Sequence, residues 1–483
     1  MSARSRELFG LLPVSLLVTA GFTAVLITRA DEVQAASVTY GVLFLGACVF
    51  AHVFIRARLK DADPYLFPLA ALLTAFGLVM IYRIDEELAR GQAIVFAIAL
   101  ALFCATIVFL RDHRVLERYR YTIAAAGLVL LLLPRAPVIG GQVNGAYLAV
   151  DLGITQFQPA EFAKLAIIVF LASYLNDTRE VLTRGRTGPP SVRRALPVVA
   201  VAAGAGLLLH LVLDLGLWPS LLTTVLLALG AEIYRERPSL KHFGPLLLVW
   251  GLAMMMIVVI QDLGAGLMFF GGFLALLYIA TQRLSFVAFG LALFAAGATV
   301  FANSLSHVQE RVEIWLDPFA RGVVEDEGYQ VAQSLFAQAD GGLFGEGFGQ
   351  ALLVPPGGGA PILPAAHTDL IYALIVNEVG LFGAAAVVLV ALLLAARGFK
   401  TAMLAEDGFS KLLAAGLTAV FALQVFVIIG GVTRVIPLTG VTLPFVSYGG
   451  SSLVANFVLL ALLLVVSDHA RSDARRSRPG GLV

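Results

Sequence analysis

Long apolar segments alternate with short polar connections along the whole chain. Many of them are about 17–25 residues long, the length that an α-helix needs to cross a hydrocarbon core of roughly 30 Å. We therefore predict an all-α fold, a polytopic transmembrane bundle of about fourteen helices. These helices are expected at residues 9–28, 38–55, 65–82, 92–110, 119–134, 160–175, 195–212, 217–234, 243–261, 264–281, 284–303, 368–396, 411–430 and 444–466.

The composition is that of a membrane protein. Of the 483 residues, 59% are hydrophobic and only 13% are charged, and the mean hydropathy is +0.90, which is too apolar for a soluble globule. Cys48 and Cys104 both lie inside predicted spans, so a disulfide framework is not expected. The first span is too long for a removable signal peptide and lacks a small-residue cleavage site.

The basic residues are distributed asymmetrically across the predicted membrane. If the N-terminus is cytoplasmic, 25 of the 33 lysines and arginines fall on the cytoplasmic side and seven on the outer side, and Lys164 lies within a helix. Because cytoplasmic loops are enriched in Lys and Arg, we predict that both termini are cytoplasmic. The basic tail at 468–483 then anchors the chain near anionic lipid headgroups, and no nucleic-acid partner is expected.

Two predicted outer loops, at 135–159 and 304–367, are long enough to be functional. The apolar positions Val331, Leu335 and Phe336 predict a short amphipathic helix lying at the interface within the second loop. A run of glycines follows them and predicts a flexible turn. The alternative is a surface lid without a catalytic part.

Four polar sites lie at the predicted outer ends of helices. Glu161 and Lys164 are three residues apart and so share one helix face. Asp262 and Asp369 each precede an apolar segment, and residues 439–452 are rich in small side chains that allow close backbone approach. Ionisable groups at a bilayer edge usually serve a substrate or an ion, so the four sites predict a shared outward cavity.

Each site also has a simpler structural explanation. Glu161 and Lys164 can form a local ion pair that neutralises both charges. Asp262 can cap the helix that follows it, and Asp369 or Thr368 can do the same for the next one. These alternatives stay open on the sequence alone.

The motifs QPAEFAK, QDLG, AHTDLIYA and LPFVSYGGSS occur in this order and resemble those of the SEDS family (shape, elongation, division and sporulation). The resemblance extends from about residue 140 to 467. It implies a peptidoglycan glycosyltransferase that polymerises lipid II into glycan strands at the outer face of the bacterial cytoplasmic membrane. It also implies a class B penicillin-binding protein as the crosslinking partner, together with other membrane proteins of the elongation or division machinery.

The resemblance also assigns residues. The acid of the HTD motif is the catalytic residue of the family, which maps onto Asp369, and the E-x-x-K pair that lines the same cavity maps onto Glu161 and Lys164. We expect the remaining motif residues and two outer arginines to bind substrate: Asp262, Arg311, His367, Thr368, Arg434, Ser447, Tyr448, Gly449, Gly450 and Ser451.

The predicted organisation departs from the family in its number of spans, which is usually ten. We divide the chain into N-terminal transmembrane helices at 1–134, a SEDS-like catalytic core at 135–467, and the basic tail. We predict that a hairpin at about 195–234 is an insertion. Asp214-Leu215-Gly216 and the apolar segment after it resemble Asp262-Leu263-Gly264 and the apolar segment that follows there. The elongation branch of the family is favoured over the division branch.

The expected chemistry needs an activated donor, because the chain has no Walker, HExxH or dinucleotide motif. A sugar on a polyprenyl pyrophosphate meets this need. Asp369 can accept the proton of the attacking hydroxyl, a contribution of about 10²–10⁴-fold. Lys164, Arg311 and Arg434 are candidates to offset the leaving pyrophosphate. No cofactor is evident, although Asp369 or Glu161 could hold a divalent cation such as Mg²⁺ or Mn²⁺.

Two other classes of function compete with this interpretation. A flippase or transporter of lipid-linked precursors would also need an amphipathic cavity, but with functional ionisable residues on both leaflets. A non-enzymatic scaffold of the wall-synthesis complex would tolerate the loss of Asp369.

Overall fold

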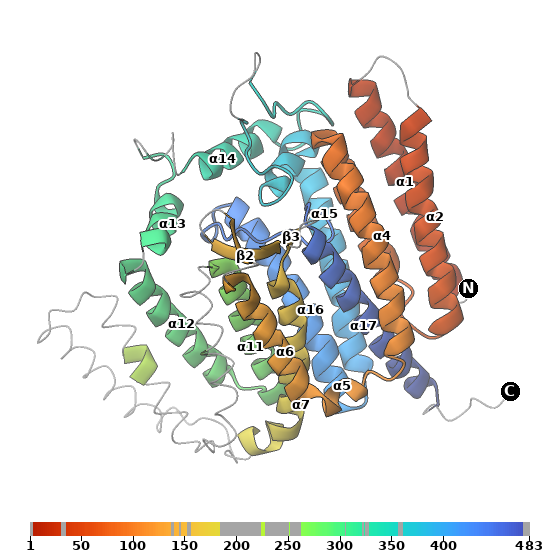
Figure 1. Ribbon diagram of the computed structural model, residues 1–483, viewed down its shortest axis with the longest axis vertical. Coiled ribbons are helices and arrows are strands. Elements are labelled where there is room, and N and C mark those ends of the chain that lie inside the picture. Colours follow the sequence, from red (N-terminus) through yellow and green to blue (C-terminus); the bar gives the residue numbers. More distant parts are fainter. Residues whose placement is uncertain are drawn as a thin grey trace, which may run out of the picture.

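The computed structural model is a bundle of long helices (Figure 1). It describes residues 3–29, 35–136, 140–143, 146–151, 156–183, 224–227, 251, 262–304, 306–320, 323, 328–355 and 361–476. The helices in the first part of the chain are α1 (Ala3–Arg29), α2 (Ala35–Arg58), α3 (Leu66–Ile84), α4 (Glu86–Phe109), α5 (Val115–Arg118), α6 (Arg120–Leu132) and α7 (Pro159–Thr183). The later helices are α11 (Leu263–Thr281), α12 (Leu284–Ser304), α13 (Ser306–Leu316), α14 (Tyr329–Gly341), α15 (Ile371–Leu404), α16 (Gly408–Val432) and α17 (Gly450–Arg476).

Among the described residues, nine helices are long and apolar enough to cross a membrane: α1–α4, α7, α11 and α15–α17. Together with the shorter α6 and α12, they coincide with eleven of the predicted spans. The predicted spans at 195–212, 217–234 and 243–261 lie outside the described residues, as does the proposed inserted hairpin. The total of fourteen and the sides of the termini stay predictions.

The central helix of the bundle is α17. It packs against α4, α7, α15 and α16, and most of its length is buried. The pair α1 and α2 lies at one edge beside α4 (Figure 1). Close approach needs small residues: a Cβ on Gly77 of α3 would lie 2.3 Å from the carbonyl oxygen of Val446, in the loop that leads into α17. Substitution of Gly77 would therefore push the two segments apart.

The long loop at 135–159 contains regular structure that we did not predict. After a 3₁₀ turn, Leu133–Arg135, three antiparallel strands follow in the order β1 (Gly140–Val143), β2 (Ala146–Asp151) and β3 (Gln156–Phe157). The sequence between β1 and β2 is Asn-Gly, the dipeptide most typical of tight hairpin connections. That signal was present, but each strand is too short for its alternation to stand out.

The second loop contains α13, which continues from the upper end of α12 in the view of Figure 1, and α14, which lies at the upper left. The predicted short helix is confirmed as α14. Its buried positions are Val331, Ala332, Ser334 and Gly341, whereas Phe336 is exposed. The small residues of α14, and not its largest apolar side chain, therefore face the bundle.

The helix α15 is broken at Gly380, where φ is +69°. The segment around Gly345 supplies the hydrogen bonds that the break removes. The amides of Glu346 and Gly347 donate to the carbonyls of Asn377 and Glu378, at 2.9 and 3.2 Å. A Cβ on Gly380 would lie 2.4 Å from the carbonyl oxygen of Leu343, so only glycine is tolerated at the break.

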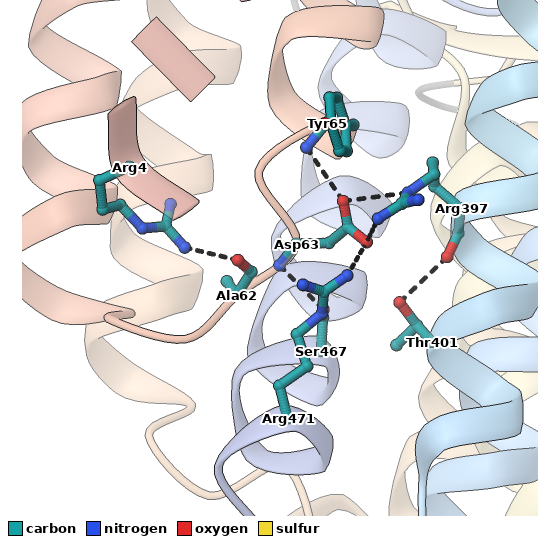
Figure 2. A network of polar contacts seen from close by, with 8 residues as sticks. All are labelled: Arg4, Ala62, Asp63, Tyr65, Arg397, Thr401, Ser467 and Arg471. Atoms are coloured by element: carbon teal, nitrogen blue, oxygen red, sulfur yellow. Dashed lines mark hydrogen bonds and ion pairs between the residues drawn. The ribbon is translucent and has the colours of Figure 1, made fainter. Parts of the chain in front are cut away.

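A buried carboxylate fastens three helices at the opposite end of α17 from the motif segment (Figure 2). Asp63 has no exposed carboxylate surface and forms ion pairs with Arg397 of α15 and Arg471 of α17. It also accepts from the amide of Tyr65 at 3.0 Å, while its own amide donates to Ser467 at 3.0 Å. Because both oxygens are paired, this acid is a structural tie.

Candidate functional site

The four predicted polar sites converge. The helices α7, α11, α15 and α17 begin close to one another, and hydrogen bonds connect the segments in which they start. The amide of Gln158 donates to the Ser451 hydroxyl at 2.8 Å, and the amide of Tyr448 donates to the carbonyl of His367 at 2.8 Å. The result is one polar region assembled from segments nearly 300 residues apart.

Glu161 and Lys164 form the ion pair that their spacing allows, with Lys164 Nζ 2.8 Å from Glu161 Oε2. Lys164 also donates to Oε1 of the fully buried Gln424 at 2.7 Å. Gln424 in turn donates to the carbonyl of Thr442 at 3.0 Å. The lysine is thus held by α7 and α16 together.

Asp262 is the N-cap of α11, since its Oδ1 accepts from the amide of Ala265 at 2.9 Å. Burial raises the pKa of Asp262, an effect that the Ala265 amide and Arg311 oppose. Asp262 also lines a cavity of about 50 Å³. The other lining residues are Gln158, Ala160, Glu161, Lys164, Ala265, Met268, Phe269, Gly440, Val441 and Thr442.

Asp369 stands beside this cavity and does not cap its helix. The residue at the N-cap of α15 is Leu370, with no side-chain cap, and the Thr368 hydroxyl donates to the Ala365 carbonyl instead. Asp369 Oδ2 lies 3.7 Å from the position of a Cβ on Gly440, which lines the cavity. Within the part of the chain that the structure describes, no group donates a hydrogen bond to this carboxylate.

The electrostatic environment of Asp369 is set by burial and by one arginine. Burial raises the pKa of Asp369 to about 6, and the charge of Arg311 opposes the rise. Arg311 donates to the carbonyl of Leu438 at 3.1 Å, which holds the guanidinium near both Asp369 and Asp262. An unbonded carboxylate whose pKa lies just below neutrality is suited to accept a proton.

The segment before α17 supports Asp369 through its neighbours. Ser447 donates its hydroxyl to the Thr368 carbonyl at 2.8 Å, and the rings of His367 and Tyr448 meet edge to face with centroids 5.7 Å apart. Burial lowers the pKa of His367, against the influence of Asp85. A Cβ on Gly449 would lie 3.2 Å from Cγ2 of Thr442, whereas one on Gly450 would make an ordinary contact with Val95. Ser447, a predicted substrate ligand, therefore serves to position the HTD segment.

Arg434 is placed elsewhere. Its guanidinium donates to the carbonyls of Trp315, at 2.7 Å, and of Leu316, the last residues of α13. The indole of Trp315 donates back to the carbonyl of Arg434 at 3.2 Å. These contacts cap the C-terminus of α13, which gives Arg434 a structural role. Of the three predicted cations, Lys164 and Arg311 lie at the site within the part of the chain that the structure describes.

Three residues that support the site or the helices around it were not predicted from the sequence. Gln424 orients Lys164, and Gln92 of α4 donates to the Ser447 carbonyl and accepts from the Gly449 amide, both at 3.3 Å. Glu378, buried further along α15, pairs with Arg83 of α3 at 3.0 Å. The available signal was a polar side chain within an apolar helix, which is costly unless it is bonded.

The residues around Asp369 offer few ligands for a divalent cation. Glu161 is occupied by Lys164 and Asp262 by the cap of α11. Of the described acids at the site, Asp369 alone accepts no hydrogen bond. Mg²⁺ is commonly held by one or two carboxylates together with substrate phosphates, so a cation there would depend on the substrate.

The chain matches known proteins over most of its length. Residues 64–472 match the family model of the cell cycle proteins FtsW, RodA and SpoVE. The chain is 38% identical to the peptidoglycan glycosyltransferase RodA of Mycobacterium bovis, over 95% of this chain and 89% of the relative. It is 27% identical to a probable peptidoglycan glycosyltransferase FtsW of Geobacter sp., over 86% of this chain and all of the relative.

Solved structures agree with the fold. A chain from a peptidoglycan synthase complex that coordinates polymerization and crosslinking aligns with a TM-score of 0.58 at 25% identity, covering 84% of this chain and 97% of that one. The rod shape determining protein RodA of Thermus thermophilus aligns with a TM-score of 0.52 at 23% identity, covering 86% and 98%. The chain therefore belongs to the FtsW/RodA/SpoVE family of cell cycle proteins.

Proposed function

We propose that this chain is a peptidoglycan glycosyltransferase that polymerises lipid II, with Asp369 as its general base. The observation that carries the proposal is the carboxylate itself: half-buried, without a hydrogen-bond donor among the described residues, beside a cavity edged by Lys164. The mycobacterial relatives, which the chain matches over most of their length, carry this activity in their names. The rival scaffold function gives no reason to bury an unbonded acid.

The reaction follows from the arrangement of charges. The acceptor sugar hydroxyl attacks the anomeric carbon of the donor, and its proton passes to Asp369. The bond between that carbon and the pyrophosphate oxygen breaks, and the polyprenyl pyrophosphate leaves with the electron pair. With an axial leaving group, this single displacement inverts the anomeric centre. Lys164 and Arg311 offset the negative charge that develops on the pyrophosphate.

The size of the cavity limits where the substrate binds. A volume of about 50 Å³ holds one or two waters, each of which takes about 30 Å³ in the liquid. We place the sugars at its mouth, near Asp369, with the pyrophosphate oxygens toward Lys164. A divalent cation bound by Asp369 and these oxygens would supply further charge neutralisation.

The location and the partner complete the proposal. The basic residues favour an inner bacterial membrane with this site facing outward, where lipid-linked donors and the growing strand meet. A class B penicillin-binding protein would crosslink the product, in line with the synthase complex to which the chain is similar. Other elongation or division proteins of the membrane would accompany the pair.

The deciding experiment uses purified full-length protein and labelled lipid II in detergent. Asp369→Asn should fold and insert but form no glycan polymer, since an amide matches the carboxylate in size and cannot take a proton. Glu310→Gln is the matched control, because it removes one exposed negative charge beside Arg311 on α13. Polymer from the Asn variant at the wild-type rate would end the assignment.

A further inference from the structure

A cluster of metal-binding side chains lies far from the proposed active site. Asp112 and His113 are in the connection between α4 and α5, and His469 is near the end of α17. His469 is nineteen positions after Gly450, which corresponds to about 28 Å along a helix. The cluster therefore sits near the end of α17 remote from Asp369.

The three side chains lie close together. One donor atom from each lies within 4.8 Å of the other two. The two imidazole rings have centroids 5.1 Å apart at an interplanar angle of 69°. A tetrahedral zinc site with bonds of about 2.0–2.1 Å separates its donors by roughly 3.3 Å. Asp112 is exposed on a loop, where its carboxylate accepts from the Arg114 amide at 3.0 Å, and a bound ion would draw the three donors closer together.

Hydrogen bonds engage one nitrogen of each ring, and the carbonyl partner of His469 requires that ring to donate from Nδ1. His113 Nε2 is bonded to the Ser410 hydroxyl, and His469 Nδ1 is bonded to the Val465 carbonyl at 2.9 Å. The nitrogens left for a ligand are His113 Nδ1 and His469 Nε2. Metal-binding histidines almost always donate their other N–H to an outer partner in this way.

One polar atom in the cluster lacks a partner. His113 is fully buried, yet its Nδ1 has no hydrogen-bond partner among the described residues. A buried unpaired donor or acceptor is costly. The ring also stacks on Phe409, and packing alone would explain an interior histidine. Packing does not explain an unpaired nitrogen facing a second imidazole and an aspartate.

We propose that Asp112, His113 and His469 bind a divalent transition-metal ion, with Zn²⁺ as the favoured ion. Two neutral imidazoles and a carboxylate are a common zinc ligand set, completed by water, and imidazole donors disfavour Mg²⁺. The bound ion clamps the α4–α5 connection to α17. Ser410 is a positioning residue, because it orients His113 without reaching the metal.

The test measures metal binding by full-length protein that carries no histidine tag. The protein in detergent is stripped with a chelator and titrated with Zn²⁺ in competition with a chromophoric indicator. One zinc per chain is expected, with no competition from Mg²⁺. His469→Gln and Asp112→Asn should each weaken binding by at least about 10-fold, and Ser410→Ala by about 10–100-fold, the usual effect of losing an outer partner.

Asp473→Asn is the matched control for Asp112→Asn, since it makes the same charge change one turn beyond His469 on α17. It should keep full affinity. Zinc should also raise the melting temperature of the wild type and of Asp473→Asn, but not that of Asp112→Asn. Asp112 is exposed, so its variant should fold. No zinc binding by the wild type, or equal binding by the wild type and both ligand variants, would overturn the proposal.

Discussion

Replacement of Asp369 by asparagine should abolish activity and at the same time stabilise the protein at neutral pH. The cause is the burial that raises the pKa of this carboxyl from 3.8 to about 6 against the opposing charge of Arg311. Each pKa unit corresponds to about 1.4 kcal/mol, so the ionised, desolvated carboxylate costs the folded state about 3 kcal/mol. The asparagine side chain carries no charge and would avoid that cost.

The sign of the pH dependence follows from the raised pKa. A neutral Asp369 favours the folded state at low pH, and this contribution is lost as the pH rises through about 6. The stability difference between Asp369→Asn and the wild type should therefore be about 3 kcal/mol at pH 8 and shrink to about 1 kcal/mol at pH 4.5. Wild-type polymerisation should show the opposite trend and rise through pH 6, because only the ionised acid is a base.

The assay is thermal unfolding in detergent at pH 8 and pH 4.5, paired with lipid II polymerisation across the same range. Glu310→Gln should change stability by no more than about 0.5 kcal/mol at either pH, since it is an exposed substitution. A pH-independent stability difference for Asp369→Asn would show that Asp369 is not desolvated. Polymerisation that stays flat between pH 5 and 8 would show that it is not the base.

Three further outcomes are expected. The double variant Glu161→Lys with Lys164→Glu should insert but lose most polymerisation, because position 164 must carry a cation at the cavity. A fully active double variant would show that the two residues serve only as an ion pair. Asp262→Ala should impair synthesis and cost about 1 kcal/mol of capping stability, while Asp214→Ala, in the predicted hairpin, should not; equal losses would place that hairpin at the site. Arg434→Ala should lower the melting temperature, because it removes the cap of α13; inactivation on heating measures this. A variant that is heat-stable but inactive would indicate that Arg434 binds the substrate instead.

Sequence patterns were sufficient where a feature repeats or is local. Eleven described helices match predicted spans because a bilayer demands about twenty apolar residues in a row. The ion pair of Glu161 with Lys164 and the cap by Asp262 follow from spacing alone. The strands of the 135–159 loop were missed because two to six residues are too few to show a period. The contacts of Arg434 with the carbonyls of α13 could not be predicted, because they are set by folding and not by spacing.

Polar side chains that meet only in the folded bundle were the hardest to interpret, and several of them gather at one end of α17. Asp63 and the pair Asp112 and His113 occur in short connections where polar residues are unremarkable, and Arg471 and His469 lie two residues apart, on the last turns of α17. Only the fold brings these positions, more than 350 residues apart, into contact. At that end, therefore, one acid is neutralised by two arginines, while two histidines and an aspartate form the proposed metal site. The same helix begins at the segment that positions Asp369, so an ion bound at its far end would act on a rigid element shared with the active site.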